Sequence, residues 1–298
     1  MKAYTKGTRR AAAALLTASA LTQFSGGQAV AADAQPRDFL PAPAGTHLGL
    51  LYYLNGSSDT FVDADGNEVP GSGLDVNIGI ARYVYFFDIG NMRADINVVQ
   101  PFGGLNNMSI GGTSFATDDF ALGDTSIVAT VWPLNDPENN RYFAVATYLT
   151  LPTGDYDPDV ASLGSNRWSM TVQPAYYFNI NPQWSVDLVG DVTIYGDNDE
   201  GPGGITIEKD PTYTALGWLN YHASAETTFS AGLSTTWGGA ETRGGVKGEA
   251  SKVTTTRVAW SQMLNPTTQF VAEIGTDVKA ENNFERKTEA VFRIAKFF

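Results

Sequence analysis

The end of the chain constrains its fold more than any other stretch. From Lys287 to Phe298, apolar and charged residues alternate with a period of two, which is typical of a β-strand whose two faces meet different solvents. A soluble sheet that ended in such a strand would expose an apolar edge, whereas a closed barrel has no edge. One face carries Ala290, Phe292, Ile294 and Phe298, and the other carries Lys287, Glu289 and Arg293. This ending therefore predicts a barrel.

Similar alternating segments recur along the chain from His47 onward. Short connections rich in Asn and Pro, such as residues 179–182 and 265–266, separate some of them. Longer connections, such as residues 101–121, separate the others, and the two kinds alternate. The predicted strands are 46–55, 74–86, 91–100, 122–132, 141–151, 166–178, 183–195, 211–222, 226–237, 252–263, 267–278 and 286–298.

This layout predicts an all-β fold, a transmembrane antiparallel up-and-down β-barrel of about 12 strands with both chain ends on the side of the short turns. A last strand that ends on the carboxylate of an aromatic residue also resembles that of bacterial outer-membrane barrels. A soluble β-sandwich is the alternative, but a sandwich has no systematic alternation of short and long loops.

The first residues read as a secretory signal peptide, residues 1–31. A basic start precedes the apolar stretch 11–21, and a small-x-small cleavage site follows at Ala29–Ala31, with Ala32–Ala34 as a second choice. The apolar stretch is too short to span a bilayer. We expect residues 32–45 to form an extended, Pro-rich lead-in and residues 46–298 to form the barrel, which places the protein in the outer membrane.

Composition excludes several functions. The chain has no cysteine, so thiol chemistry and cysteine metal sites are excluded. Removal of residues 1–34 leaves 15 basic and 31 acidic residues, a net charge of −16. A surface that acidic disfavours nucleic acid as a partner.

Aromatic residues gather near both ends of the predicted strands, as two membrane interfaces would select. Those near the long loops are Tyr148, Trp168, Tyr195, Tyr213 and Trp237. Those near the short turns are Tyr85, Phe86, Phe87, Trp132, Tyr142, Phe143, Tyr176, Tyr177, Phe178, Trp184, Tyr221, Phe270, Phe297 and Phe298.

Alternation also predicts which side chains face the lumen, because charge on the lipid face costs about 2–4 kcal/mol per basic residue at mid-membrane. Arg82 is an exception: it shares the parity of Ile80 and Val84, so either a bulge near Ala81 or a place at the interface would be needed. The predicted lumen-lining residues are Asp75, Asn77, Arg93, Asp95, Asp187, Asp191, Arg257, Glu273, Glu289 and Arg293.

A lining of mixed charge has two interpretations. In the first, the charges simply pair to satisfy a polar interior, which the general pairing of buried charges favours. Alternatively they form a constriction that selects a solute. Twelve strands lie between the filled eight-stranded barrels and the open sixteen-stranded porins, so a narrow pore is physically possible.

Two segments resemble a known family. Gly154-Asp155-Tyr156-Asp157 and Asn166-Arg167-Trp168, together with Pro43–Thr46 ahead of Leu50–Tyr53, look like the outer-membrane family named for the MetA-pathway (meta-pathway) of phenol degradation. The resemblance spans nearly the whole chain after the signal. It implies a channel or transporter for the passive uptake of small hydrophobic or aromatic compounds.

Two rival functions are carried alongside this one. The first is a structural or adhesive barrel with a plugged lumen, whose acidic loops are the working surface. The second is a lipid hydrolase, for which His222 is the relevant base, but no nucleophile motif accompanies it. We therefore predict no enzyme activity.

The acidic loops suggest neither a cofactor nor a metal site. The segment Asp63–Glu68 resembles part of a calcium loop, but Gly66 is misplaced and the distant Glu is absent. Solvated loops against outer-membrane lipid and lipopolysaccharide are the expected arrangement, and divalent cations that bridge the loops to lipopolysaccharide stay open as an alternative.

Overall fold

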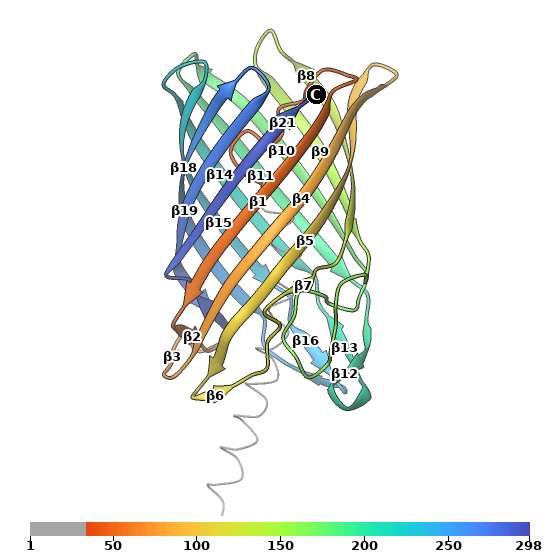
Figure 1. The fold of residues 1–298 in the computed structure, drawn as a ribbon, viewed down its shortest axis with the longest axis vertical. Helices are drawn as coiled ribbons and strands as arrows, with labels where there is room; N and C mark the ends of the chain where they lie inside the picture. The colour runs from red at the N-terminus through yellow and green to blue at the C-terminus, as the bar shows by residue number, and fades with distance from the viewer. Residues whose placement is uncertain (1–33) are drawn as a thin grey trace, which may run out of the picture.

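The wall of the molecule is a single ring of long strands (Figure 1). The computed structural model describes residues 34–298, so the predicted signal peptide, residues 1–31, lies outside the described residues. The strands of the wall are β1 (His47–Ser58), β4 (Gly73–Ile89), β5 (Met92–Ile110), β8 (Ser126–Asp136), β9 (Arg141–Thr150), β10 (Ser169–Asn181), β11 (Trp184–Tyr195), β14 (Thr212–His222), β15 (Thr227–Gly238), β18 (Ser251–Asn265), β19 (Thr268–Glu281) and β21 (Thr288–Phe297).

Pairing of the first strand with the last closes the ring. β1 pairs antiparallel with β21 from Leu48↔Phe297 to Ser57↔Thr288, and each of the other strands pairs with its neighbours in sequence order. Closure satisfies the backbone polar groups of every strand and leaves no edge, which is what a lipid environment demands. The predicted antiparallel 12-stranded barrel is thereby confirmed.

The largest difference in strand length is at β5, which was predicted to end near residue 100 and instead runs to Ile110. Pro101 interrupts the apolar alternation and hid the continuation. The proline is tolerated because β5 pairs with β8 only from Arg93 to Val99, so the missing N–H of Pro101 costs no ladder bond on that side.

Short strands lie in the long loops at one end of the barrel. We call this the long-loop end, and the opposite one, which carries the chain's C-terminus, the short-turn end; they are the lower and upper ends in Figure 1. The loop strands are β2 (Thr60–Val62), β3 (Glu68–Val69), β6 (Thr113–Ser114), β7 (Ala121–Leu122), β12 (Asn198–Gly201), β13 (Ile205–Lys209), β16 (Glu241–Arg243), β17 (Val246–Lys247) and β20 (Asn283–Glu285), with the 3-10 turn η1 (Pro202–Gly204). No helix in residues 34–298 has the length and apolarity to cross a membrane.

An apolar core fills the barrel interior near the long-loop end. Phe61 and Phe284 pack edge to face with ring centroids 5.3 Å apart, and the same buried cluster includes Leu74, Ile78 and Leu105. The inner face of β4 is therefore apolar in this region.

This core reverses the faces predicted for β4. Asp75 and Asn77, predicted to line the lumen, lie on the outer face, where Ser57 Oγ donates to Asp75 (2.9 Å) and Asn55 Nδ2 donates to Asn77 (2.9 Å). The prediction was wrong because it assumed that apolar side chains must meet lipid, whereas here they meet the protein's own interior.

Arg82 follows from the same reversal. It needs neither a bulge nor an interfacial position, since pairing of β4 with β1 is regular around Ala81. The Arg82 side chain points inward, and its Nε donates to Asn97 Oδ1 at 3.1 Å.

Only some of the aromatic residues predicted to form the two bands lie on the outer wall. Tyr85, Trp184, Tyr221 and Trp237 are exposed on the outer wall, as a membrane interface requires. Four residues assigned to the bands are instead buried in the interior: Phe86, Trp132, Tyr148 and Tyr177.

Candidate functional site

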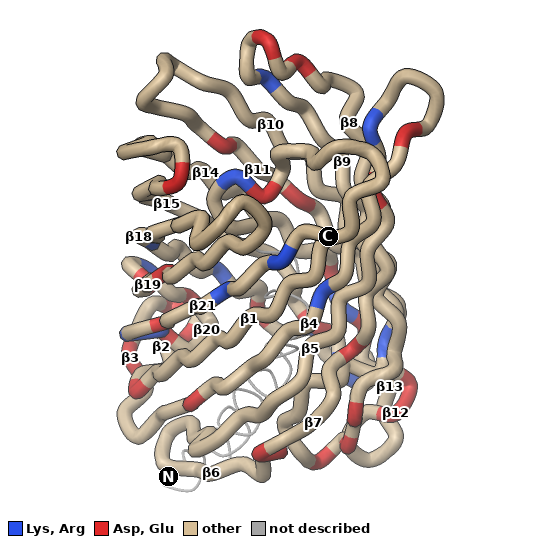
Figure 2. Tube along the Cα trace, turned by 45° about the horizontal axis from the view of Figure 1, so that its top comes forward, with Lys and Arg blue, Asp and Glu red and all other residues tan. Residues whose placement is uncertain are grey.

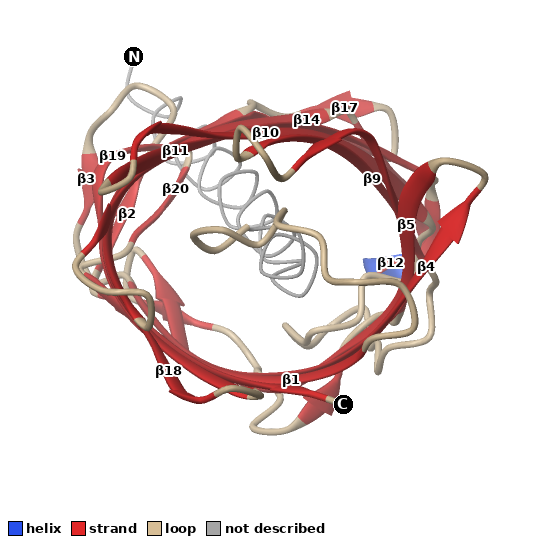
Figure 3. Ribbon diagram, turned by 90° about the horizontal axis from the view of Figure 1, so that it is seen from above, coloured by secondary structure: helices blue, strands red, loops and turns tan. Residues whose placement is uncertain are grey.

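The segment ahead of β1 lies inside the barrel and is the centre of the candidate site. Seen from above, loop segments occupy the space within the ring of strands (Figure 3). Two buried tryptophans hold the segment's backbone: Trp132 Nε1 donates to the carbonyl of Phe39 (2.9 Å), and Trp218 Nε1 donates to that of Ala34 (3.0 Å). Arg93 donates to the carbonyl of Ala42. We call residues 34–46 the luminal segment; turns at Gln35–Asp38 and Arg37–Leu40 make it less extended than predicted.

The strand register explains how one of these tryptophans, Trp218, reaches the luminal segment. Trp218 stands opposite Gly232 in the β14–β15 ladder, and a Cβ added at Gly232 would lie 2.5 Å from the indole ring. The glycine therefore gives the indole room to lie across the neighbouring strand and reach the luminal segment.

Side chains of the luminal segment also bind the wall. Asp38 forms an ion pair with Arg293. Gln35 Nε2 donates to Glu273 at 3.3 Å, and the backbone N–H of Arg37 donates to Asp187 at 3.4 Å. Contacts from β11, β19 and β21 thus hold the segment inside the barrel.

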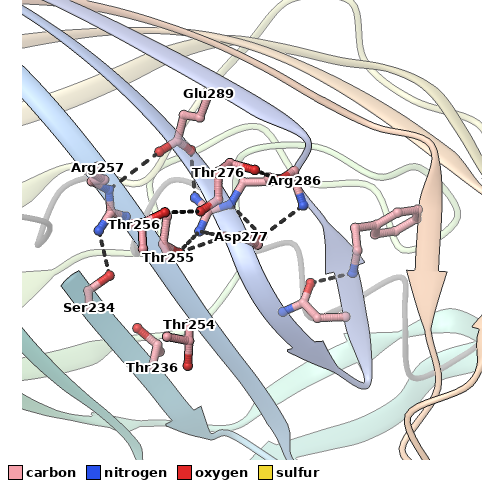
Figure 4. Close-up of polar contacts among 12 residues, drawn as sticks. Ser234, Thr236, Thr254, Thr255, Thr256, Arg257, Thr276, Asp277, Arg286 and Glu289 are labelled. Carbon is pink, nitrogen blue, oxygen red and sulfur yellow. Dashed lines mark hydrogen bonds and ion pairs between the residues drawn. The ribbon is translucent and has the colours of Figure 1, made fainter. Parts of the chain in front are cut away.

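A charged cluster lies on β18, β19, β21 and the loop before β21 (Figure 4), and Gln35 of the luminal segment donates to its Glu273. Arg257 Nε is 3.2 Å from Glu273 Oε1 and 3.9 Å from Glu289 Oε1. Arg286 closes the cluster at 2.6 Å from Glu289 and 3.0 Å from Asp277. Basic and acidic positions accordingly lie next to one another on these strands (Figure 2).

A second polar cluster lies on β4 and β5, which β1 separates from β21. Asn97 Nδ2 donates to Asp95 at 2.8 Å and Asn97 accepts from Arg82. Four interior residues contact the luminal segment or its charged neighbours although sequence analysis did not assign them to the site. They are Arg82, Trp132, Trp218 and Arg286. For the tryptophans, no pattern in the sequence separated an inward indole from an interfacial one.

Two small cavities lie beside the luminal segment. A cavity of about 20 Å³ lies between Asp38, Phe39 and Arg82. Another of about 70 Å³ lies between Gln35, Trp218 and Arg257. An apolar cavity of roughly 150 Å³ is known to bind benzene, so neither space admits an aromatic ring while the segment stays in place.

A wider apolar groove of about 410 Å³ lies on the wall across β21, β1, β4 and β5. Leu51, Tyr53 and Phe292 line it and are exposed on the outer surface. The groove therefore lies on the outer face of the wall and does not belong to the lumen.

Comparisons with known proteins agree with this architecture. The family model described as MetA-pathway of phenol degradation matches residues 58–293. The chain belongs to this family. The resemblance inferred from the sequence is therefore confirmed.

Solved structures add to the family assignment. An outer membrane channel from Pseudomonas putida F1 is 29% identical, with a TM-score of 0.84, over 89% of this chain and 100% of that chain. The translocator domain of the autotransporter NalP from Neisseria meningitidis is 11% identical, with a TM-score of 0.57, over 95% of this chain and 99% of that chain, and it shows the fold alone. No curated protein matches.

The residues that carried the family resemblance knot three long loops together. The N–H of Leu122 donates to Asp155 Oδ2 (2.7 Å), and Tyr156 Oη donates to the carbonyl of Glu200 (3.1 Å). Asn166 Nδ2 donates to both Asn198 and Glu200 at 3.1 Å.

The last two residues of the motif, Arg167 and Trp168, differ in exposure. Trp168 is exposed, whereas Arg167 is buried. Asp157 accepts from the N–H of Asp159 (2.9 Å). At the nearby Asp118, burial and the neighbouring acids raise the pKa of the carboxyl above its usual value.

Gly154 is a position in this knot that has no room for a side chain. A Cβ there would lie 2.8 Å from backbone atoms of Asp124 and of Gly164. We expect Gly154→Ala to lower the free energy of unfolding by about 1–3 kcal/mol through overpacking, measured as the denaturation midpoint in detergent. Gly217→Ala, whose added Cβ makes only ordinary contacts, is the matched control, and equal midpoints for the two variants would contradict the overpacking.

The hydrolase alternative finds little support in the geometry. His222 Nε2 lies 2.9 Å from Ser185 Oγ, which is the spacing of a nucleophile and its base. Ser185 is fully buried, however, and Nδ1 of His222 contacts the hydroxyl of Thr228 (3.2 Å) rather than a carboxylate. Within residues 34–298, no group of three or more His, Cys, Asp or Glu residues is arranged to hold a metal ion.

Proposed function

We propose that the protein is an outer-membrane channel for the passive uptake of small hydrophobic or aromatic compounds. The observation that carries this proposal is a closed barrel of a channel-containing family with a polar interior that one short segment occupies. We place the path of the solute along the inward-facing charges Arg93, Asp95, Asp187, Asp191, Arg257, Glu273, Glu289 and Arg293. Export by residues 1–31 and contact of the wall with outer-membrane lipid and lipopolysaccharide belong to the same proposal.

The luminal segment acts as the gate in this proposal. Its attachments are several hydrogen bonds, each with a net worth of about 0.5–3 kcal/mol, the ion pair of Asp38 with Arg293 and the buried side chain of Phe39. The segment shifts only when several of these contacts break together. The cavities of about 20 and 70 Å³ beside it are too small for an aromatic solute. Passage of a solute beside the segment through either space therefore requires the segment to shift.

Two measurements test the proposal. A deletion strain is expected to take up aromatic acids, phenols or alkanes more slowly than its parent, with uptake restored by the gene on a plasmid. In planar bilayers the purified protein is expected to conduct in brief openings as the segment moves.

A structural or adhesive barrel is the second candidate, and the filled lumen is the observation in its favour. It predicts no conductance, no liposome swelling and unchanged uptake of every solute. That combination of results would replace the channel function.

A further inference from the structure

A pocket at the long-loop end has the chemistry of an anion site. It lies between the loop that joins β9 to β10 and the loops that carry β12, β13 and β16, which group together in Figure 1. Arg167 and Arg243 line it together with polar groups of Tyr156, Ser162 and Asn198.

Arg167 is the unusual member of this pocket. Its side chain is only 5% exposed, yet Nη1 makes no hydrogen bond with any described residue. Its Nη2 faces Glu241 Oε1 at the long distance of 3.8 Å. Leaving a buried charged donor unsatisfied costs about 1–3 kcal/mol or more, so the arrangement favours an added acceptor.

The carboxylate of Glu241 is the partner of more than one cation in this region. Glu241 also accepts from Arg243 Nη2 at 3.1 Å and Nε at 3.3 Å. Lys209 stands opposite Glu241 in the β13–β16 ladder, and its ammonium lies over the ring of Tyr195, 4.9 Å from the centroid. Burial lowers the pKa of Lys209 to about 8, while Glu241 opposes this shift.

The second acid at the pocket, Asp157, does not balance these cations. It is exposed at the rim, and its oxygen is engaged by the N–H of Asp159. On the buried side of the pocket, Arg167 and Arg243 therefore face a single carboxylate, that of Glu241.

We infer that this pocket binds the carboxylate of a small monocarboxylic acid with an apolar body. A guanidinium presents paired N–H donors that match a carboxylate. Pro158, Val160 and Ile207 line the rest of the pocket and would pack against the apolar body. A phosphate would instead place oxygens against these apolar walls and a second charge near Glu241.

The dimensions agree with a carboxylate. The cavity is about 60 Å³, where a single water needs roughly 10–15 Å³. The head group therefore fits inside, with the apolar body towards the rim. This inference deepens the proposed function by naming acids as a solute class, and it rests on that function only for what happens after binding.

Binding is tested without transport, by titrating the purified protein in detergent with benzoate and following heat in a calorimeter. Benzyl alcohol, which lacks the charge, and inorganic phosphate are the comparison probes. We expect benzoate to bind at least tenfold more tightly than either, from one charge-assisted bidentate contact. Phosphate binding as tight as benzoate overturns the carboxylate assignment, and no benzoate binding overturns the site.

Substitutions locate the binding. Arg167→Met is expected to weaken benzoate binding about tenfold or more. Arg141→Met, which removes an exposed arginine at the short-turn end paired with Asp136, is expected to leave binding unchanged. If Arg167→Met does not give a folded barrel, Arg243→Gln provides the same test. Binding that survives in whichever variant folds overturns the inference.

These results separate the inference from the proposed function. A protein that conducts in bilayers but binds no benzoate keeps the channel function and loses the site. A protein that binds benzoate but never conducts keeps the site and loses the channel.

Discussion

Deletion of residues 35–43 is expected to raise the mean conductance of the channel by roughly tenfold or more, because a twelve-stranded barrel without its luminal segment has an unobstructed polar lumen. The deletion removes the Asp38–Arg293 ion pair and the Phe39 carbonyl that accepts from Trp132. It leaves every strand of the wall intact. The measurement is single-channel recording in planar bilayers, with liposome swelling as a second readout.

A point variant separates gating from simple removal of bulk. Arg293→Met keeps the full luminal segment but removes the ion-pair partner of Asp38. The methionine side chain has a similar length and fills the space that the arginine side chain occupies. We expect more frequent openings than in the natural protein, with an open-state conductance close to that of the deletion. Identical recordings from the natural protein and the deletion would show that the segment does not control the pore.

The sequence was sufficient for the wall of the barrel because strand alternation is a local property. Each long strand of the wall from β8 to β21 begins and ends within a few residues of its predicted bounds, since polar side chains there point into the barrel and apolar side chains point outward. The inward positions of Arg257 and Glu273 follow from the same rule.

The interior could not be predicted, because its contents come from distant parts of the chain. β4 was assigned the wrong faces since its apolar side chains pack on Phe61 and Phe284, which lie on other loops. Likewise, the sequence marked Arg167 through a family motif. Only the fold brings Glu241, from another loop, beside it.

The charged cluster around Arg257 yields the prediction with the largest effect on stability. Arg257 is 4% exposed and faces the buried Glu273 at 3.2 Å. We expect Arg257→Met to lower the free energy of unfolding by about 3–5 kcal/mol, because it leaves buried carboxylates without this cation. The double variant Arg257→Met/Glu273→Gln is expected to recover much of the loss, since it also removes one of those charges.

The measurement is the urea midpoint of refolded protein in detergent, read from the mobility difference between folded and unfolded barrel on gels. Arg141→Met again is the matched control: its pair with Asp136 at 2.9 Å is half exposed, so its loss should cost only about 0–1 kcal/mol. A loss for Arg257→Met no larger than for this control would mean that water reaches the cluster and screens it. In that case the lumen is hydrated around β18 and β19 even with the segment in place, and the closed state would conduct ions although it excludes aromatic rings.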